Sequence, residues 1–162
     1  MARHFRRATP FVLLLLAGGV SAAVAFELDD QFGTKHSRAD IFAGRPVVMM
    51  VGMARKTPDA MEAWDKALRS KAPSSARIIG FSNLDEVPFF VPKSSIIKTL
   101  QKQFPKTPVL CDWDGKIYRQ LGFPDGATIA IAVFDADGRR LGIVNGAVND
   151  ARMKEVLSLL PG

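Results

Sequence analysis

Past residue 26, apolar and polar positions alternate between strand-like runs and helix-like periods. Residues 47–53 (VVMMVGM) form a continuous apolar run, which is typical of a strand covered on both faces. A helix is predicted to follow, with Thr57 as its N-cap and Pro58 at its first position. One face of that helix has three large apolar side chains: Met61, Trp64 and Leu68. Residues 77–81 (RIIGF) predict a second buried strand.

The middle of the chain contains a proline-rich segment and a second helical pattern. Residues 82–92 (SNLDEVPFFVP) contain two prolines and predict a long loop. Apolar residues then recur at helical spacing: Ile96, Ile97, Leu100 and Phe104. Pro105 and Pro108 end this helix before a third strand at 109–111.

The last third of the chain predicts a turn, a short helix, a hairpin and a final helix. Residues 112–115 (DWDG) form the turn, and 117–121 the short helix. Strands at 128–134 and 141–144 are joined by a tight D-x-D-G turn, so they should pair antiparallel. Asn149 should cap a helix with four apolar positions: Met153, Val156, Leu157 and Leu160. This order predicts an α/β fold, a mixed sheet sandwiched between helices.

The amino terminus has the pattern of an export signal. Residues 1–10 are basic, residues 11–17 read FVLLLLA, and Ala23-Val24-Ala25 places small residues where a signal peptidase accepts them. We expect cleavage after Ala25, which leaves one domain at 26–162, in the periplasm if the cell is bacterial. The alternative is an uncleaved signal anchor, but the apolar stretch is shorter than the roughly 20 residues of a spanning helix. We expect no stable membrane anchor after cleavage.

Composition and charge exclude several classes of protein. The chain has 162 residues, 48% of them hydrophobic and 23% charged, which suits one domain with a core. Three of its 22 basic residues lie in the first ten positions, so the part from Phe26 onward carries 19 bases against 16 acids, a net charge of +3. Such a small excess is not typical of a nucleic-acid-binding protein.

Cys111 is the only cysteine in the sequence. It cannot form an internal disulfide, a cysteine-rich zinc cluster or a redox dithiol. Because Cys111 ends an apolar strand, we expect it to be packed like a small hydrophobic residue. The alternative is a reactive thiol, which would make the protein a single-cysteine thiol oxidoreductase or a peroxidase-like enzyme.

These elements resemble the thioredoxin-like redoxins that bacteria export. Residues 47–64 align without a gap on the strand and helix that carry the C-x-P-C motif in redoxins, with Pro58 on the motif proline. Lys56 and Asp59 occupy the two cysteine positions, so the dithiol is absent. Residues 125–131 also contain no proline, whereas redoxins have a cis-proline there.

A closer resemblance is to the YtfJ family of exported, thioredoxin-like proteins without the dithiol. It is carried by VPKSSIIKTLQKQFP, VLCDWDGKIYRQL and AIAVFDADGRRLGIVNGAVNDARMKEVLSLL. The resemblance implies a redox-inactive protein of the exported compartment and brings no catalytic residue with it. We therefore expect a non-enzymatic binding or accessory protein with no cofactor, whose partner is a periplasmic protein or a small anionic ligand.

The start of the helix after the first strand is a candidate binding site. Arg55 and Lys56 precede Thr57 and Asp59, and free N–H groups with two positive charges could hold a carboxylate or a phosphate. The alternative is a solvated basic loop. We interpret His36 as a turn residue, and we expect no metal site, because one histidine is too few and neither D-x-D-G turn is followed by the glutamate of a calcium loop.

Phe89 and Phe90 lie between two prolines in the predicted loop. Both rings either pack against the sheet or form a surface for a partner or ligand. We predict the second arrangement.

Overall fold

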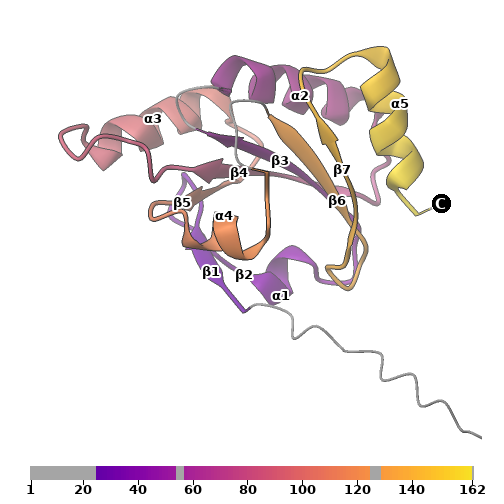
Figure 1. The fold of residues 1–162 in the computed structure, drawn as a ribbon, viewed down its shortest axis with the longest axis horizontal. Coiled ribbons are helices and arrows are strands. Elements are labelled where there is room, and N and C mark those ends of the chain that lie inside the picture. The colour runs from indigo at the N-terminus through magenta and orange to yellow at the C-terminus, as the bar shows by residue number, and fades with distance from the viewer. Residues whose placement is uncertain (1–24, 54–56, 125–128, 162) are drawn as a thin grey trace, which may run out of the picture.

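The computed structural model describes residues 25–53, 57–124 and 129–161. In this part of the chain, strands and helices alternate (Figure 1). The elements, in chain order, are β1 (Glu27–Asp29), β2 (Lys35–Ser37), α1 (Arg38–Ile41), β3 (Val47–Met53), α2 (Pro58–Lys71), β4 (Arg77–Asn83), α3 (Lys93–Gln103), β5 (Val109–Asp112), α4 (Lys116–Gln120), β6 (Ala130–Phe134), β7 (Arg140–Asn145) and α5 (Asp150–Leu159). None of the described helices has the length and apolarity needed to span a bilayer.

Five strands form a mixed sheet in the order β5-β4-β3-β6-β7. Strands β3, β4 and β5 are parallel, with Val51 opposite Phe81 and Phe81 opposite Leu110. Strand β6 runs antiparallel to β3 and to β7, as the hairpin prediction required. The predicted α/β architecture is confirmed.

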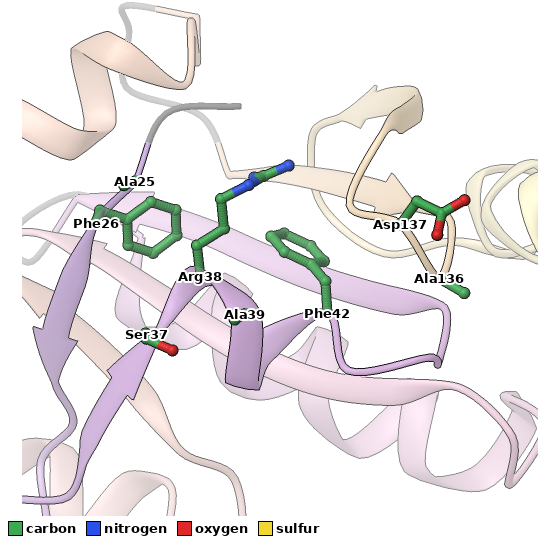
Figure 2. Close-up of a pocket in the computed structure, with 8 residues that line it drawn as sticks. All are labelled: Ala25, Phe26, Ser37, Arg38, Ala39, Phe42, Ala136 and Asp137. Carbon is green, nitrogen blue, oxygen red and sulfur yellow. The ribbon is translucent and has the colours of Figure 1, made fainter. Parts of the chain in front are cut away.

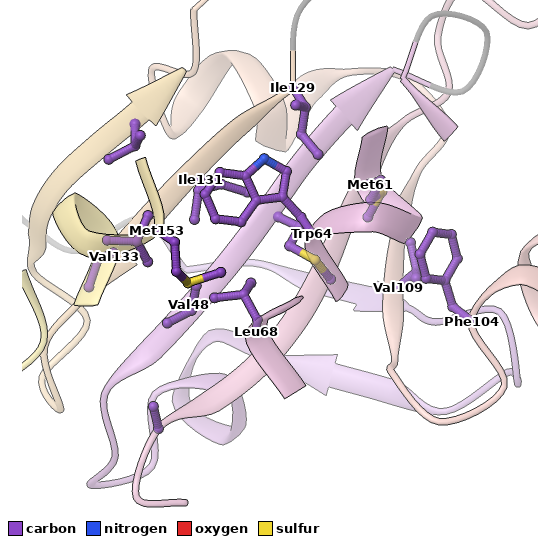
Figure 3. Packing of buried hydrophobic residues seen from close by; sticks show 14 of the residues in the cluster. Val48, Met61, Trp64, Leu68, Phe104, Val109, Ile129, Ile131, Val133 and Met153 are labelled. Carbon is purple, nitrogen blue, oxygen red and sulfur yellow. The ribbon is translucent and has the colours of Figure 1, made fainter. Parts of the chain in front are cut away.

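The sheet separates two cores. Helices α2, α3 and α5 cover one face, and α1, α4 and the β1–β2 hairpin lie on the other (Figure 1). Trp64 of α2 is fully buried in the first core beside Val48 and Ile131, and its indole N–H donates to the Gly146 carbonyl at 3.0 Å (Figure 3). This bond satisfies the polar atom of a large buried ring and ties α2 to the segment between β7 and α5.

The C-terminal elements form where the sequence predicts them, except that α5 ends at Leu159 and Leu160 lies just outside it. Asp135 Oδ1 accepts N–H bonds from Asp137 and Arg139, and Gly138 has a φ of 77°, so the turn uses both the carboxylate and the glycine. Asn149 caps α5 by accepting the Arg152 N–H at 2.8 Å.

Three sequence expectations need correction. First, β1, β2 and α1 were not predicted, although Ser37 and Asp40 form a capping box at the start of α1. Second, Ser82 and Asn83 belong to β4 rather than to the following loop, because they continue its pairing with Cys111 and Asp112. Third, α3 ends at Gln103, so Phe104, the last residue of the predicted helical spacing, is the C-cap of this helix and is fully buried.

Candidate functional site

The carboxyl ends of β3, β4 and β5 lie at one edge of the sheet, because the three strands are parallel. Four sequence-predicted residues lie in segments that begin or end there: Thr57 and Asp59 at the start of α2, and Phe89 and Phe90 in the loop after β4. Cys111 lies one residue before the end of β5. Arg55 and Lys56 lie outside the described residues, so the anion site remains a prediction. In α/β folds, ligands bind at this edge of the sheet.

Thr57 does not cap α2 in the way the sequence suggested. It occupies the N-cap position, but its hydroxyl makes no capping bond and instead returns to Met53, accepting its N–H at 2.9 Å and donating to its carbonyl at 3.1 Å. Thr57 is therefore buried, at 4% exposure, while Asp59 is exposed. Of these two predicted binding residues, only Asp59 is accessible to a ligand, and its negative charge would repel an anion.

A row of small residues crosses the sheet beneath α2 and α3. Gly52, Ser82 and Cys111 are register partners on β3, β4 and β5, so they share one face. Gly52 leaves room for the Thr57 hydroxyl, since a Cβ at position 52 would collide with it. No local pattern along the chain indicates this row, because it arises only when the strands pair.

Ser82 faces a small cavity between α2 and α3. The cavity has a volume of about 110 Å³, and Met53, Met61 and Ile96 contribute to its apolar lining. Ser82 is 3% exposed, and within the described part of the chain its hydroxyl has no hydrogen-bond partner. Thr57, Thr99 and Gln103 also line the cavity, so a small group that entered it would meet both apolar and polar side chains.

Cys111 is packed as the sequence predicted. It is 3% exposed, and its Sγ lies 3.5 Å from the Val109 carbonyl oxygen. Burial, together with the negative charges of Asp30 and Asp29, raises the pKa of the Cys111 thiol to about 12. A reactive cysteine needs the opposite surroundings, with cations that stabilise the thiolate.

A larger cavity opens at the outer edge of β5. It has a volume of about 470 Å³ and is lined by both acids and bases, among them Asp29, Lys35 and Asp112. The Lys93 ammonium lies over the Trp113 ring, 4.7 Å from its centroid, and both residues line this cavity. Cys111 forms part of the wall of this cavity and of a neighbouring one of about 270 Å³.

The pKa values of Asp112 and Asp114 are shifted in opposite directions. Burial raises the pKa of Asp112, and the hydrogen bond with the Asp114 side chain adds to that increase. The Lys116 N–H lowers the pKa of Asp114, which is exposed. Asp112 also accepts the Tyr118 N–H at 2.7 Å, so its carboxylate organises the turn into α4.

His36 is not the turn residue that the sequence suggested. It lies in β2, is 9% exposed, and its Nε2 is 2.8 Å from Asp30 Oδ2. The other Asp30 oxygen accepts the N–H groups of Phe32 and Thr34. The contact between His36 and Asp30 therefore stabilises the β1–β2 hairpin. Among the described residues, no group of three or more potential metal ligands occurs.

Phe89 and Phe90 are on the surface. They are 100% and 72% exposed, and their rings contact each other edge to face at a centroid distance of 5.8 Å. The alternative in which they pack against the sheet is therefore wrong. We call these two residues the aromatic tip.

A separate cavity of about 450 Å³ lies near the β6–β7 turn (Figure 2). The Arg38 side chain extends between the rings of Phe26 and Phe42, with its guanidinium carbon 4.9 Å from the Phe42 centroid. It also donates to the Gly138 carbonyl at 3.0 Å. Its guanidinium thus joins α1 to the hairpin turn, which gives Arg38 a structural role.

No protein-family model matches the sequence, and no curated protein matches it either. Solved structures do match. A secreted disulfide oxidoreductase of Mycobacterium tuberculosis, homologous to E. coli DsbE, has 18% identity and a TM-score of 0.61, with 83% of this chain and 96% of that chain covered. The fold is thioredoxin-like.

Two further structures agree with this fold. Peroxidoxin BcpB from M. tuberculosis has 22% identity and a TM-score of 0.62, covering 84% of this chain and 91% of that one. The exposed lipoprotein thioredoxin Etrx1 of Streptococcus pneumoniae has 15% identity and a TM-score of 0.65, covering 85% and 100%. The resemblance to the YtfJ family is not confirmed by these comparisons.

Proposed function

We propose that this chain is an exported thioredoxin-fold protein that acts by binding a partner rather than by exchanging disulfides. The observation that carries the proposal is the exposure of the aromatic tip, since two adjacent phenylalanine rings left in water mark an interaction surface. The second support is chemical. Lys56 and Asp59 stand where redoxins have cysteines, and the thiol of Cys111 is buried. The partner we propose is a periplasmic protein or a small anion.

The alternative function is thiol chemistry through Cys111 alone. It is favoured by the solved structures of similar fold, which include disulfide oxidoreductases and a peroxidoxin, and by the position of Cys111 in the wall of a cavity. Its high pKa opposes this function, because a protonated thiol is a poor nucleophile at neutral pH.

Insulin reduction in the presence of dithiothreitol separates the two functions. Disulfide exchange needs an attacking and a resolving cysteine, so we expect the protein and its Cys111→Ser variant to give the same background rate. Turnover comparable to that of a thioredoxin, lost in Cys111→Ser, would establish the alternative.

The binding function is tested with the immobilised mature protein and a periplasmic extract. We expect Phe89→Ala/Phe90→Ala to lose the captured partner, because aromatic residues commonly dominate an interface. Phe32→Ala is the matched control, since Phe32 is also an exposed phenylalanine, at 49%. Equal capture by the tip variant and the control would contradict the role of the tip.

Export is supported by the signal pattern, and the residue that would follow the cleavage site is held in the fold. Phe26 is 8% exposed, and its carbonyl accepts the Arg38 N–H at 3.0 Å. We propose cleavage after Ala25, and mass spectrometry of the secreted protein should find Phe26 at the amino terminus. Recovery of the full-length chain from washed membranes would indicate a signal anchor instead.

A further inference from the structure

The loop that carries the aromatic tip projects away from the sheet, between β4 and α3 (Figure 1). Phe89 is fully exposed, so no other part of the described chain shields its ring. Leaving two such rings in water is unfavourable, and the unfavourable contact is removed if the tip enters an apolar medium.

In the stretch that contains and follows the tip, every charged residue is basic. Residues 87–106 contain four lysines and no acid, while Asp85 and Glu86 precede this stretch. Lys98 and Lys102 are four residues apart, so they share one side of α3. Both are exposed, as is Lys106, and within the described part of the chain none of the three forms an ion pair. We call Lys98 and Lys102 the basic side of α3; Lys106 lies just beyond the end of this helix.

We propose that the aromatic tip and the basic side of α3 attach the protein reversibly to an anionic phospholipid surface. The proposal rests on the proposed function in one respect, that the tip is a binding surface. Aromatic rings that enter the headgroup region, next to lysines that face anionic lipids, are the combination by which interfacial proteins bind membranes.

A lipid surface fits these features better than an acidic protein does. The tip is a small projection, and the lysines are spread along a helix. Such an arrangement does not form one continuous, closely packed patch of the kind that a folded partner buries. A bilayer needs no complementary shape, because lipids move to accommodate inserted rings.

The test is co-sedimentation of the mature protein, residues 26–162, with two kinds of vesicle. One contains phosphatidylglycerol and phosphatidylcholine, and the other phosphatidylcholine alone. We expect binding to the anionic vesicles, weakened by salt, and binding at least about tenfold weaker to the neutral ones.

Two variants and two controls locate the binding surface. Phe89→Ala/Phe90→Ala and Lys98→Glu/Lys102→Glu should each weaken binding by about tenfold or more. Phe32→Ala changes another exposed phenylalanine, and Lys66→Glu/Lys154→Glu reverses two exposed lysines on α2 and α5. Both controls should stay within about twofold of the unmodified protein, and thermal melts verify that all four variants fold.

Several results would overturn the inference. Failure of the folded protein to bind anionic vesicles would do so, as would equal losses in the controls. If the protein does not bind vesicles but binds immobilised polyglutamate through Lys98 and Lys102, the partner is an acidic protein. Each of these outcomes leaves the thiol assay and the capture of a periplasmic partner unaffected, so the proposed function is judged separately.

Discussion

The Thr57 hydroxyl joins the start of α2 to the end of β3 through two hydrogen bonds to one residue, Met53. Thr57→Val keeps the shape but removes both bonds and leaves a buried N–H without its partner. We expect a loss of about 1–3 kcal/mol in the free energy of unfolding, measured by urea denaturation. Thr57→Ser keeps the hydroxyl and should lose less. A Val variant as stable as the unmodified protein would show that the junction is held by other contacts.

The aromatic tip should contribute little to stability. Phe89→Ala/Phe90→Ala removes rings that are exposed, so we expect a cooperative melt within a few degrees of the unmodified protein. Phe104→Ala is the matched control from the core, where a fully buried ring is worth about 3–5 kcal/mol. Loss of the cooperative melting transition in the tip variant would show that the two rings pack in the core.

Asp112 should make stability depend on pH in the acidic range. Because burial raises its pKa in the folded protein, its contribution is present below the unfolded pKa of about 4 and is lost as the pH rises through the folded value. Asp112→Asn removes this charge and keeps an oxygen that can accept the Tyr118 N–H. We expect the variant to gain stability relative to the unmodified protein as the pH rises above about 4, measured by urea denaturation.

Asp112→Ala is the control for this prediction. It also removes the charge, but it leaves the Tyr118 N–H without an acceptor and should be less stable than Asp112→Asn at every pH. A constant difference in stability between Asp112→Asn and the unmodified protein across this range would show that Asp112 is ionised with an ordinary pKa.

The elements from β3 to α5 could be predicted because each has its own periodic pattern. The apolar run of β3 and the helical spacing of Met61 and Leu68 depend only on local sequence. The β1–β2 hairpin has no such pattern. Its three-residue strands depend on tertiary contacts, including the His36–Asp30 bond and the bridge from Asp30 to Leu110 on β5.

The candidate site was predictable only in part. The prolines around Phe89 and Phe90 indicated a loop but left both packing and exposure possible, and the structure has the exposed arrangement that we predicted. The inward orientation of the Thr57 hydroxyl could not be predicted, because a threonine before a proline usually indicates an N-cap. Ser82 was missed because its position beside Cys111 depends on the pairing of β4 with β5.

Cys111 should weaken the fold at alkaline pH. Its pKa is raised to about 12 in the folded protein, so its contribution to stability is complete below the unfolded pKa and is lost as the pH rises toward 12. From about pH 9, this single thiol should cost about 1.4 kcal/mol per pH unit. Cys111→Ala removes that dependence. Its stability should approach that of the unmodified protein, or exceed it, as the pH rises, and parallel curves would contradict the raised pKa.

The proposed binding function requires that the Cys111 thiol be buried in the core and take no part in chemistry. The most direct measurement is the rate at which Cys111 reacts with DTNB at about pH 8, in buffer and in urea. We expect one thiol to react promptly in urea and almost none in the folded protein, where the rate should be limited by opening of the structure. Prompt reaction in the folded protein, at a rate similar to that in urea, would contradict the account and assign Cys111 a chemical role.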